Sequence, residues 1–400
     1  MRPQSLLAVA LVLAAGCSSN LEFPIVDGEA PVLEAIGEGE GALRFIAWAG
    51  YAEDGSSDPD VDWVTPFEER TGCKIQVRYA DSADEMLGLM RRAGAQTYDG
   101  ISAPGDVAGE LIAAGEVQAV DPRMFSSWRQ VLEPLRSEEA KHFVVDGRVY
   151  GVPALYGPNA LLFAPTELDP APTSWDVVFE PDSPAAGRIS MFDSPMAIAD
   201  AAMYLASREP ELGIQDPYAL TPTQLEAAIS LLRAQEPNVA LYWSSFTDQV
   251  DAFAEQEVVA GAGWPIALGL LDLRSRPIEG AEPVEGMTGW ADTWMVATEA
   301  AHPNCMLRWM NWTLRPDVQA QMALWYGAAP SNGRACPLLR RSLGGLADLA
   351  DTLRFGHCGD EAFLGSLALW RRPTVDCGDG RARVCAGYPA WQLRWRSVRD

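Results

Sequence analysis

The stretch GRVYGVPALYGPNALLFAP, from Gly147 to Pro165, divides the chain into two parts. Its two short apolar runs are interrupted by glycine and proline, which is typical of strands that end at turns. Before it, predicted strands and helices alternate from Leu43 onward, and after it a second alternating series extends to about residue 287. Alternation of this kind predicts an α/β fold with mostly parallel sheets that helices cover on both faces.

The two series predict two α/β lobes with a hinge between them. The predicted strands cover 43–49, 73–80, 98–104, 187–193 and 293–298, and the predicted helices cover 58–72, 82–94, 105–117, 194–206 and 221–235. We expect lobe 1 to contain 42–154 together with about 288–336, and lobe 2 to contain 155–287. Clefts at strand ends between such lobes bind ligands. The Cys- and Trp-rich segment 337–400 fits neither series, and its lobe stays open.

The chain is long enough for about two domains and is strongly acidic. Its 400 residues include 55 Asp and Glu against 30 Lys and Arg, which gives a formal net charge of −25. Such a surface repels the phosphates of nucleic acid, so no nucleic-acid partner is expected. The same charge is compatible with a cationic ligand.

The N-terminus carries the pattern of an export signal. Arg2 precedes the apolar run 6–15, which is too short for an ordinary membrane span and fits the core of a signal peptide. The run leads into LAAGC, and a small residue followed by Gly directly before Cys resembles a bacterial lipobox. We therefore expect a lipoprotein signal peptide over 1–16, an acylated Cys17 as a membrane anchor, and an acidic tether over 17–41. An ordinary secretory signal peptide without the lipid is the alternative.

The other six cysteines predict disulfides, because an even number in an exported chain is typical of disulfide-bonded domains. Cys377 and Cys385 are the closest pair, and we expect them to be bonded. A metal centre is disfavoured, since the sequence has no C-x-x-C motif and only three histidines, at His142, His302 and His357.

Aromatic and acidic residues stand at the ends of several predicted strands, where side chains can face a cleft. These residues are Trp48, Tyr51, Asp193, Trp264, Trp290 and Asp292. Carboxylates bind ammonium groups through charge-assisted hydrogen bonds, and indole faces cover methylenes and attract cations. The set therefore predicts a ligand in which methylenes join ammonium groups. Core packing is the alternative for each Trp, and a helix cap is the alternative for Asp193.

Two other functions are less well supported by the sequence. A pair of cleft carboxylates could serve a hydrolase, but no G-x-S-x-G motif occurs and the histidines lie in no triad-like context. We therefore predict no enzymatic activity and no catalytic residues. The stretch DGSSDPDVD, 54–62, could be read as a calcium loop of a structural lipoprotein, but it lacks the glycine and the final glutamate of an EF-hand.

Six motifs follow one another along most of the chain: AWAGYAED, YGVPALYGPNALLF, TSWDVVFEPDSPAAGRISMFD, EQEVVAGAGW, GWADTWMVAT and NWTLRPDVQAQMALWYGAAPSN. In this order, from about Leu43 to Asn332 and behind a lipobox, the chain resembles the bacterial spermidine/putrescine-binding proteins. These are the substrate-binding subunits of polyamine ABC transporters. The resemblance implies the type II periplasmic-binding fold, in which two α/β lobes close on a ligand at a hinge.

The resemblance also implies which residues face the ligand. Trp48, Tyr51, Trp264 and Trp290 match cleft aromatics of the family, Asp292 matches a carboxylate that holds a ligand amine, and Asp193 matches another cleft carboxylate. The chain departs from the family pattern at Gly50, Pro104, Asp106, Met196 and Ala328. Of these, Asp106 is expected to hold an ammonium group from the other lobe. The departures leave open which amine is bound.

The predicted function is that of a lipid-anchored solute-binding protein of a bacterial ABC importer, in the periplasm or at the cell surface. The protein would capture a small cationic solute, first of all a polyamine such as putrescine or spermidine. We expect a monomer without a cofactor that docks on the permease subunits. The alternative is the same fold with a different ligand, such as an opine, a thiamine-like compound, another amine-containing metabolite or ferric iron.

Overall fold

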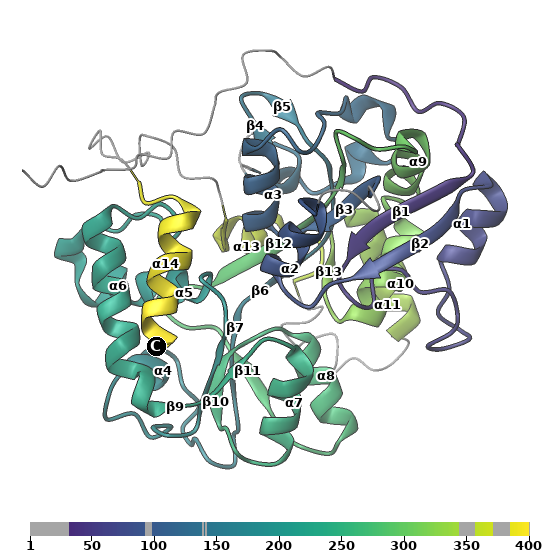
Figure 1. The fold of residues 1–400 in the computed structure, drawn as a ribbon. Coiled ribbons are helices and arrows are strands. Elements are labelled where there is room, and N and C mark those ends of the chain that lie inside the picture. The colour runs from purple at the N-terminus through teal and green to yellow at the C-terminus, as the bar shows by residue number, and fades with distance from the viewer. Residues whose placement is uncertain are drawn as a thin grey trace, which may run out of the picture.

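The computed structural model describes residues 32–92, 98–137, 140, 142–343, 357–370 and 385–399. The expected signal peptide, the lipidation site Cys17 and the disulfide candidate Cys377 lie outside the described residues. Within the described part, two sheets with flanking helices form two lobes (Figure 1).

Lobe 1 is built on a sheet whose main strand order is β13-β6-β12-β3-β1-β2, with β14 paired to β12. The strands are β1 (Ala42–Ala47), β2 (Lys74–Tyr79), β3 (Gly100–Ala103), β6 (Val152–Pro158), β12 (Thr288–Val296), β13 (Ala329–Pro330) and β14 (Ala368–Leu369). β1 runs parallel to β2 and β3, whereas β12 runs antiparallel to β3 and β6. The sheet is therefore mixed rather than mostly parallel, because β6 and β12, the strands next to the lobe crossings, pair with each other in opposite directions.

Lobe 2 contains a five-stranded sheet in the order β11-β7-β10-β8-β9. Its strands are β7 (Ala160–Phe163), β8 (Ile189–Phe192), β9 (Val239–Trp243), β10 (Ala260–Gly263) and β11 (Glu279–Ala281). β8 lies parallel to β9 and β10, and β7 lies antiparallel to β10 and β11. A short hairpin of β4 (Val144–Val145) and β5 (Arg148–Val149) precedes the first crossing between the lobes.

Helices cover both sheets, and their ends follow local sequence signals. Lobe 1 has α1 (Val64–Thr71), α2 (Ala83–Met90), α3 (Gly105–Ala113), α9 (Pro303–Thr313), α10 (Pro316–Tyr326) and α11 (Cys336–Leu343). Lobe 2 has α4 (Asp176–Phe179), α5 (Ala197–Arg208), α6 (Pro222–Gln235), α7 (Phe246–Ala254) and α8 (Ile266–Leu273), and α13 (Glu361–Ser366) and α14 (Tyr388–Arg399) follow near the C-terminus. Single turns of 3₁₀ helix are η1 (Pro122–Met124), η2 (Trp128–Gln130), η3 (Glu133–Leu135), η4 (Pro210–Leu212), η5 (Glu236–Asn238) and η6 (Gly333–Ala335). α1 ends at the left-handed Gly72, as predicted, and α6 begins with a capping box of Thr221 and Gln224.

Two adjacent stretches of the described chain connect the two sheets. β6 continues into β7 through Asn159, and β11 leads back into β12. The Asn159 backbone N–H donates to the Thr288 carbonyl at 2.8 Å, and Asn159 Nδ2 donates to Thr288 Oγ1 at 2.7 Å. These bonds hold the two crossings together and mark the hinge. β6 stays in the lobe 1 sheet through Pro158, so this lobe extends beyond the predicted boundary at residue 154.

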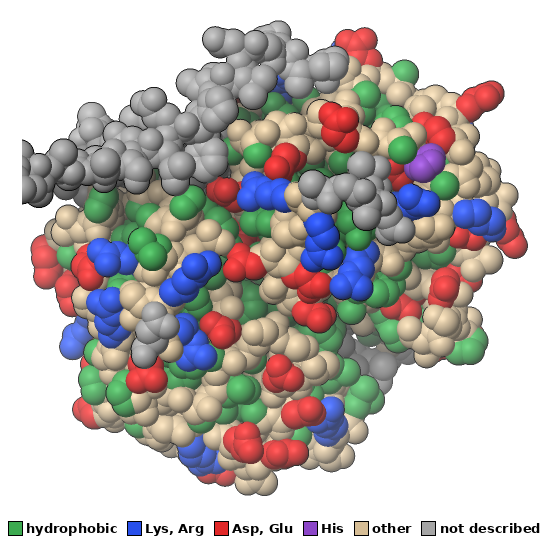
Figure 2. Space-filling view, viewed as in Figure 1, with side chains coloured by type: hydrophobic (Ala, Val, Ile, Leu, Met, Phe, Trp, Pro, Cys, Tyr) green, Lys and Arg blue, Asp and Glu red, His purple; other side chains and the backbone are tan. Residues whose placement is uncertain are grey.

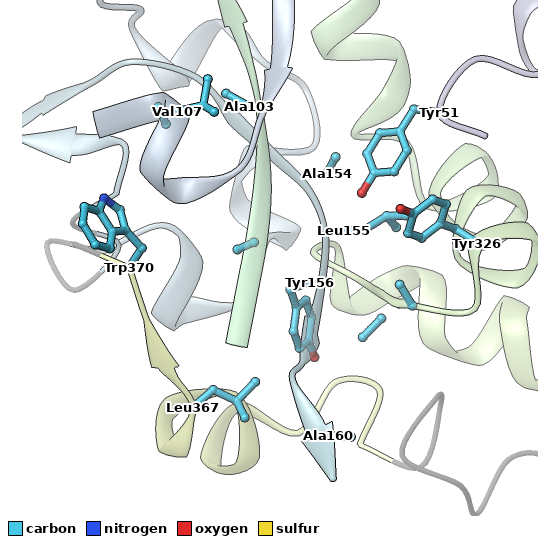
Figure 3. Packing of buried hydrophobic residues seen from close by; sticks show 14 of the residues in the cluster. Tyr51, Ala103, Val107, Ala154, Leu155, Tyr156, Ala160, Tyr326, Leu367 and Trp370 are labelled. Atoms are coloured by element: carbon cyan, nitrogen blue, oxygen red, sulfur yellow. The ribbon is translucent and has the colours of Figure 1, made fainter. Parts of the chain in front are cut away.

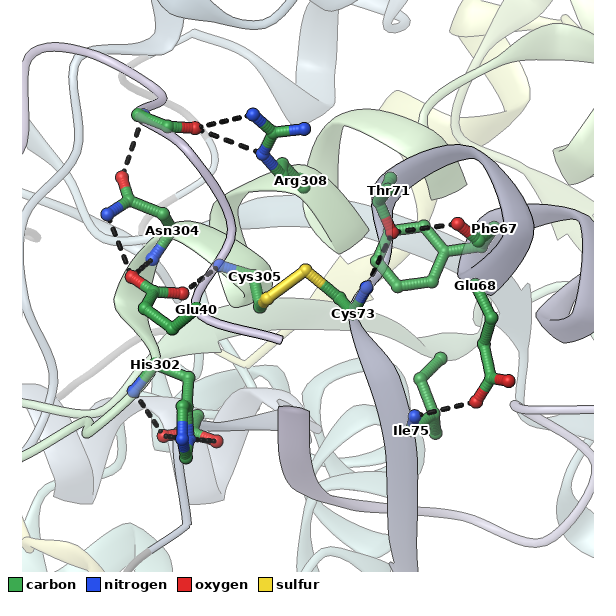
Figure 4. The surroundings of a disulfide bond; sticks show 12 residues. Glu40, Phe67, Glu68, Thr71, Cys73, Ile75, His302, Asn304, Cys305 and Arg308 are labelled. Atoms are coloured by element: carbon green, nitrogen blue, oxygen red, sulfur yellow. Dashed lines mark hydrogen bonds and ion pairs between the residues drawn. A yellow bond between two sulfur atoms is a disulfide. The ribbon is translucent and has the colours of Figure 1, made fainter. Parts of the chain in front are cut away.

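A disulfide between Cys73 and Cys305 joins the start of β2 to α9 within lobe 1 (Figure 4). The Glu40 carboxylate accepts hydrogen bonds from the backbone N–H groups of Asn304 and Cys305 at 2.9 and 2.8 Å. Glu40 therefore caps the first turn of α9. It also attaches the end of the predicted tether 17–41 to lobe 1.

The C-terminal segment, whose lobe the sequence left open, is shared between the lobes. β14 joins the lobe 1 sheet beside β12, and a second disulfide, Cys336–Cys358, secures the start of α11. α14 instead packs on α6 of lobe 2 (Figure 1). Cys385 is disulfide-bonded, and its predicted partner Cys377 lies outside the described residues.

The apolar core of lobe 1 surrounds β6 and β12. Figure 3 shows Tyr51 and Tyr326 side by side, and their ring centroids are 4.9 Å apart. Trp370 lies across β12 from this pair in the same view. Because close packing holds side chains in single rotamers, the residues that β12 presents to the cleft are well fixed in position.

Candidate ligand-binding site

A cavity of about 80 Å³ lies between the two lobes. Its lining comes from both lobes, from the hinge and from the C-terminal segment, and it is largely aromatic. Five of the predicted ligand-binding residues meet here, namely Trp48, Asp106, Trp264, Trp290 and Asp292. The fold therefore gathers predicted residues that are up to 244 positions apart, from Trp48 to Asp292, around one small space.

Asp292 reaches the cavity from within β12, whereas the sequence placed it just before a strand. The register of β12 against β6 shifts between Ala291 and Thr293, and such an irregularity redirects the side chain at that point. The Tyr51 hydroxyl donates to Asp292 Oδ2 at 2.5 Å. Burial raises the Asp292 pKa to about 7, the bond from Tyr51 opposes this rise, and the charge on Asp106 adds to it.

Tyr51 has a different position from the one predicted for it. It is fully buried and does not line the cavity, but it holds the carboxylate that does. Burial and the neighbouring Asp292 charge raise the Tyr51 pKa, so its hydroxyl stays protonated and acts as a donor. The residue is therefore a support for Asp292 rather than a contact for the ligand.

Asp106 is the second residue of α3, and its carboxylate accepts a hydrogen bond from the Tyr388 hydroxyl at 2.9 Å. Burial raises its pKa to about 6, and the bonds from Tyr388 and from the backbone N–H of Val107 limit that rise. The position at the start of a helix also favours a negative charge. Asp106 is thus the more readily ionised of the two acids.

The electrostatics of the cavity favour a positively charged ligand. Asp106 and Asp292 are each 3% exposed, and no lysine or arginine is among the described residues that line the cavity. An ionised carboxylate is costly to bury unless a counter-charge and hydrogen bonds compensate it. Each acid has a tyrosine donor but no cationic partner among these lining residues. A cationic ligand would supply what is missing.

Aromatic rings form much of the remaining wall. Trp264 packs edge-on against Trp243 and Phe192, with ring centroids 5.0 and 5.3 Å apart, and its Nε1 donates to Asn159 Oδ1 at 3.2 Å. Trp290 lies over Gly157, where a Cβ atom would approach the indole to 2.9 Å, so glycine is needed opposite it. Fixed indole rings of this kind cover methylenes and attract cations.

Asp193 does not line this cavity but a neighbouring pocket between α2, the end of β8 and α14, so its predicted role as a ligand carboxylate stays a prediction. Its Oδ1 accepts a hydrogen bond from Trp395 Nε1 at 2.9 Å and lies 3.4 Å from Arg399 Nε. The alternative prediction, a helix cap, is wrong, because it is Ser194 that accepts from the Met196 backbone N–H. The distant segment α14 forms the other side of the pocket that Asp193 lines.

The sequence missed several lining residues. They are His142, Asn159, Phe192, Tyr218, Tyr326 and Trp370. Burial lowers the His142 pKa to about 3, so this side chain is neutral and adds no positive charge. Tyr326 belongs to the motif WYGAAPSN, in which a cleft tyrosine was expected two positions later, at Ala328. Tyr326 could therefore have been found from that motif, whereas Trp370 gave no signal because its place depends on the pairing of β14 with β12.

The described residues contain no group of three or more His, Cys, Asp or Glu that could hold a metal ion. Across the same part of the chain, no helix combines the length and the apolar character that crossing a membrane would need.

Comparisons with known proteins identify the class. The family model for bacterial extracellular solute-binding proteins matches residues 62–335. The chain belongs to this family. It is 24% identical over 304 residues to the putrescine/agmatine-binding protein of Pseudomonas aeruginosa, and the match covers 70% of this chain and 79% of the relative. It is 23% identical over 308 residues to the spermidine/putrescine-binding periplasmic protein of Escherichia coli, with 75% and 84% covered.

The fold is that of polyamine-binding solute-binding proteins. The solved structure of the spermidine/putrescine ABC transporter substrate-binding protein PotD from Streptococcus pneumoniae superposes with a TM-score of 0.65 at 18% identity, covering 90% of this chain and 99% of that one. The predicted family and the two-lobed α/β fold are therefore confirmed. Proteins of this class bind a small ligand and deliver it to the permease subunits of an ABC importer, and they are not enzymes.

Proposed function

We propose that this chain captures a small organic polyamine in the cavity between its lobes and delivers it to the permease of an ABC importer. One observation carries the proposal: two buried carboxylates face an aromatic cavity whose described lining has no lysine or arginine. Ammonium groups would pair with Asp106 and Asp292, and the methylenes between them would lie against Trp264 and Trp290. Relatives named for binding putrescine, agmatine or spermidine support the same ligand class.

The size of the cavity favours a short member of that class. It holds about 80 Å³, whereas pockets for drug-sized ligands hold roughly 300–1,000 Å³. A diamine such as putrescine therefore fits the space better than spermine. Closure would follow from linkage, because a ligand that contacts both lobes binds the closed state better and shifts the population toward it.

We also propose that Cys17 carries a lipid that holds the protein at a membrane surface. The lipobox-like LAAGC supports this, and residues 1–31 lie outside the described part. Fatty-acid labelling of the wild-type protein, with loss of the label in Cys17→Ala, is the expected result. A wild-type protein that is secreted without a label would show an ordinary signal peptide instead.

A thermal-shift panel tests the ligand class. It would compare putrescine, spermidine, spermine, agmatine, thiamine and neutral amino acids at pH 8. A ligand present at one hundred times its dissociation constant adds about 2.7 kcal/mol of stability, so a true ligand gives a clear shift. We expect putrescine to give the largest shift. No shift with putrescine, spermidine, spermine or agmatine, together with a shift from thiamine or from an amino acid, would overturn the proposal.

A further inference from the structure

The C-terminal helix α14 is fixed to lobe 2. Arg394 forms an ion pair with Glu226 of α6 at 2.7 Å, and Trp395 Nε1 donates to Asp193 at 2.9 Å. In Figure 2, Lys and Arg side chains gather over the region where α14 and α6 lie side by side, next to acidic groups. Trp391 and Trp395 of α14 also pack against Tyr218 and Tyr242 of lobe 2. These contacts hold the helix on lobe 2, because an exposed ion pair alone adds little stability.

The same helix reaches across the cleft to lobe 1. The Tyr388 hydroxyl donates to Asp106 at 2.9 Å, and Gln392 Nε2 donates to Asp84 at 2.9 Å. Because Tyr388 and Gln392 are four residues apart, they share one face of α14. Tyr388 is only 2% exposed, so its hydroxyl is committed to the carboxylate.

This contact joins α14 to the candidate ligand site. Asp106 lines the cavity, and Trp370, which also lines it, packs edge-on against Tyr388 with ring centroids 5.7 Å apart. A donor that reaches a carboxylate from the opposite lobe keeps its position only while the lobes are together. The bond from Tyr388 therefore depends on lobe position in a way that a bond within lobe 1 does not.

We propose that Tyr388 is a positioning residue of the ligand site, which holds the Asp106 carboxylate from across the cleft and couples cation binding to the docking of α14 on lobe 1. This inference rests on the proposed function, because it gives Asp106 the role of a ligand carboxylate. The C-terminal segment, whose lobe the sequence left open, thereby contributes a positioning residue to the ligand site.

The surroundings of Asp106 explain why this donor matters. The titratable groups that face Asp106 or Tyr388 are Asp84 of α2, Glu110 of α3, Asp292 of β12, Tyr218, and the neutral His142 beside Gly105. Each of these is acidic or neutral, so none supplies a positive charge. The bond from Tyr388 lowers the Asp106 pKa against the effect of burial, and its removal should raise that pKa.

The first test measures the unfolding of the full chain without ligand at pH 4.5 and pH 8. The Asp106 pKa is about 6 in the folded protein against 3.8 ordinarily, so this group's contribution to stability falls as pH rises through that window. Tyr388→Phe should raise the pKa of Asp106 in the folded protein further, so that stability falls over a wider range of rising pH. We expect its loss in Tm at pH 8 to be at least about twice its loss at pH 4.5. In an Asp106→Asn background, this pH dependence should disappear.

Two control variants distinguish the specific role of Tyr388 from a general loss of fold stability. Tyr204→Phe removes a similar bond, in which the phenol donates to Glu180 at 2.5 Å far from the cavity lining. Gln392→Ala removes the hydrogen bond from α14 to Asp84 of lobe 1 and leaves Tyr388 in place. Neither control should change the pH dependence of putrescine binding. Equal losses of Tm for Tyr388→Phe at both pH values, or the same pH dependence without Asp106, would overturn the inference.

The second test uses putrescine as the probe in isothermal titration. Tyr388→Phe should weaken binding by about tenfold at pH 6.5 and by less than about threefold at pH 8.5, where Asp106 is ionised with or without its donor. The same loss at both pH values would contradict the inference. If the wild-type protein binds no polyamine, the proposed function fails, and the unfolding test still decides whether Tyr388 holds Asp106.

Discussion

The two carboxylates of the cavity are supported in different ways. Asp292 and its donor Tyr51 both belong to lobe 1, so their bond does not depend on how far apart the lobes are. Asp106 also belongs to lobe 1, but its donor Tyr388 lies on α14, which is fastened to lobe 2. One acid is therefore part of a rigid wall, whereas the surroundings of the other depend on closure.

This difference suggests a division of roles between the acids. Asp292 is available to an amine whether the lobes are open or closed. Asp106 gains its donor, and with it a more stable charge, when α14 meets lobe 1.

Removal of both carboxylates should have the largest effect. Asp106→Asn combined with Asp292→Asn takes away both counter-charges, and an ammonium group left in a buried site without one is strongly destabilised. We expect putrescine affinity at pH 8 to fall on the order of a thousandfold or more by isothermal titration. Binding that survives the double substitution within about tenfold would show that the cavity is not the amine site.

Asp292→Asn alone should weaken putrescine binding at pH 8 by at least about tenfold. The asparagine oxygen can still accept the Tyr51 bond, so the wall stays intact while its charge is lost. Asp248→Asn, at an exposed position on α7, is the matched control and should bind normally. An unchanged dissociation constant for Asp292→Asn would remove this residue from the site.

Replacement of an indole should have a smaller effect on binding. Trp264→Leu keeps the position apolar but removes the flat ring and its attraction for cations, which contributes about 0.5–2 kcal/mol. We expect putrescine to bind roughly 3- to 30-fold more weakly. Tm should be measured alongside, because Trp264 also packs on Trp243. Tighter binding by a folded variant would mean that the ring limits the space rather than contacts the ligand.

The same Asp292→Asn variant should be more stable than the wild type when no ligand is present. The pKa of Asp292 is about 7 in the folded protein against 3.8 ordinarily. Below about pH 4 the carboxyl group is protonated, so its burial does not lower the stability through ionisation. Above about pH 7 the folded protein bears the full free-energy cost of burying the ionised carboxylate. Asparagine avoids this cost, and we expect Tm to rise by several degrees at pH 8 but hardly at pH 4. A lower Tm at pH 8 would show that the charge is already compensated.

Much of the fold was predictable because it follows from local patterns. The alternation of apolar and amphipathic segments located β1, β2, β3, α2 and α6 to within a few residues. The start of β12 was not predicted, because Gly289 and Asp292 interrupt the apolar run that marks its second half. This part becomes a strand through its pairing with β6, which is distant in the sequence.

The candidate site was predicted less completely, for a physical reason. Residues next to predicted strands, such as Trp264 and Asp292, could be assigned to a cleft from the fold class alone. Asp193 fits the same rule, yet it lines a neighbouring pocket beside α14, and the position of α14 depends on contacts with Glu226 and Asp106 that no local pattern encodes. Tyr388 was missed for the same reason.

The claim that two buried carboxylates bind an amine is tested most directly by measuring the affinity of the wild-type protein for putrescine at pH 8.0 and pH 5.5. Alkyl amines titrate near pH 10, so the ligand stays fully charged, and only the protein changes. Because the pKa values of Asp106 and Asp292 are about 6 and about 7, both acids are mostly protonated at the lower pH. We predict binding that is at least about tenfold tighter at pH 8.0, with release of protons on binding near pH 6.5. Equal affinity at both pH values, without proton release, would contradict the claim that Asp106 and Asp292 bind the amine.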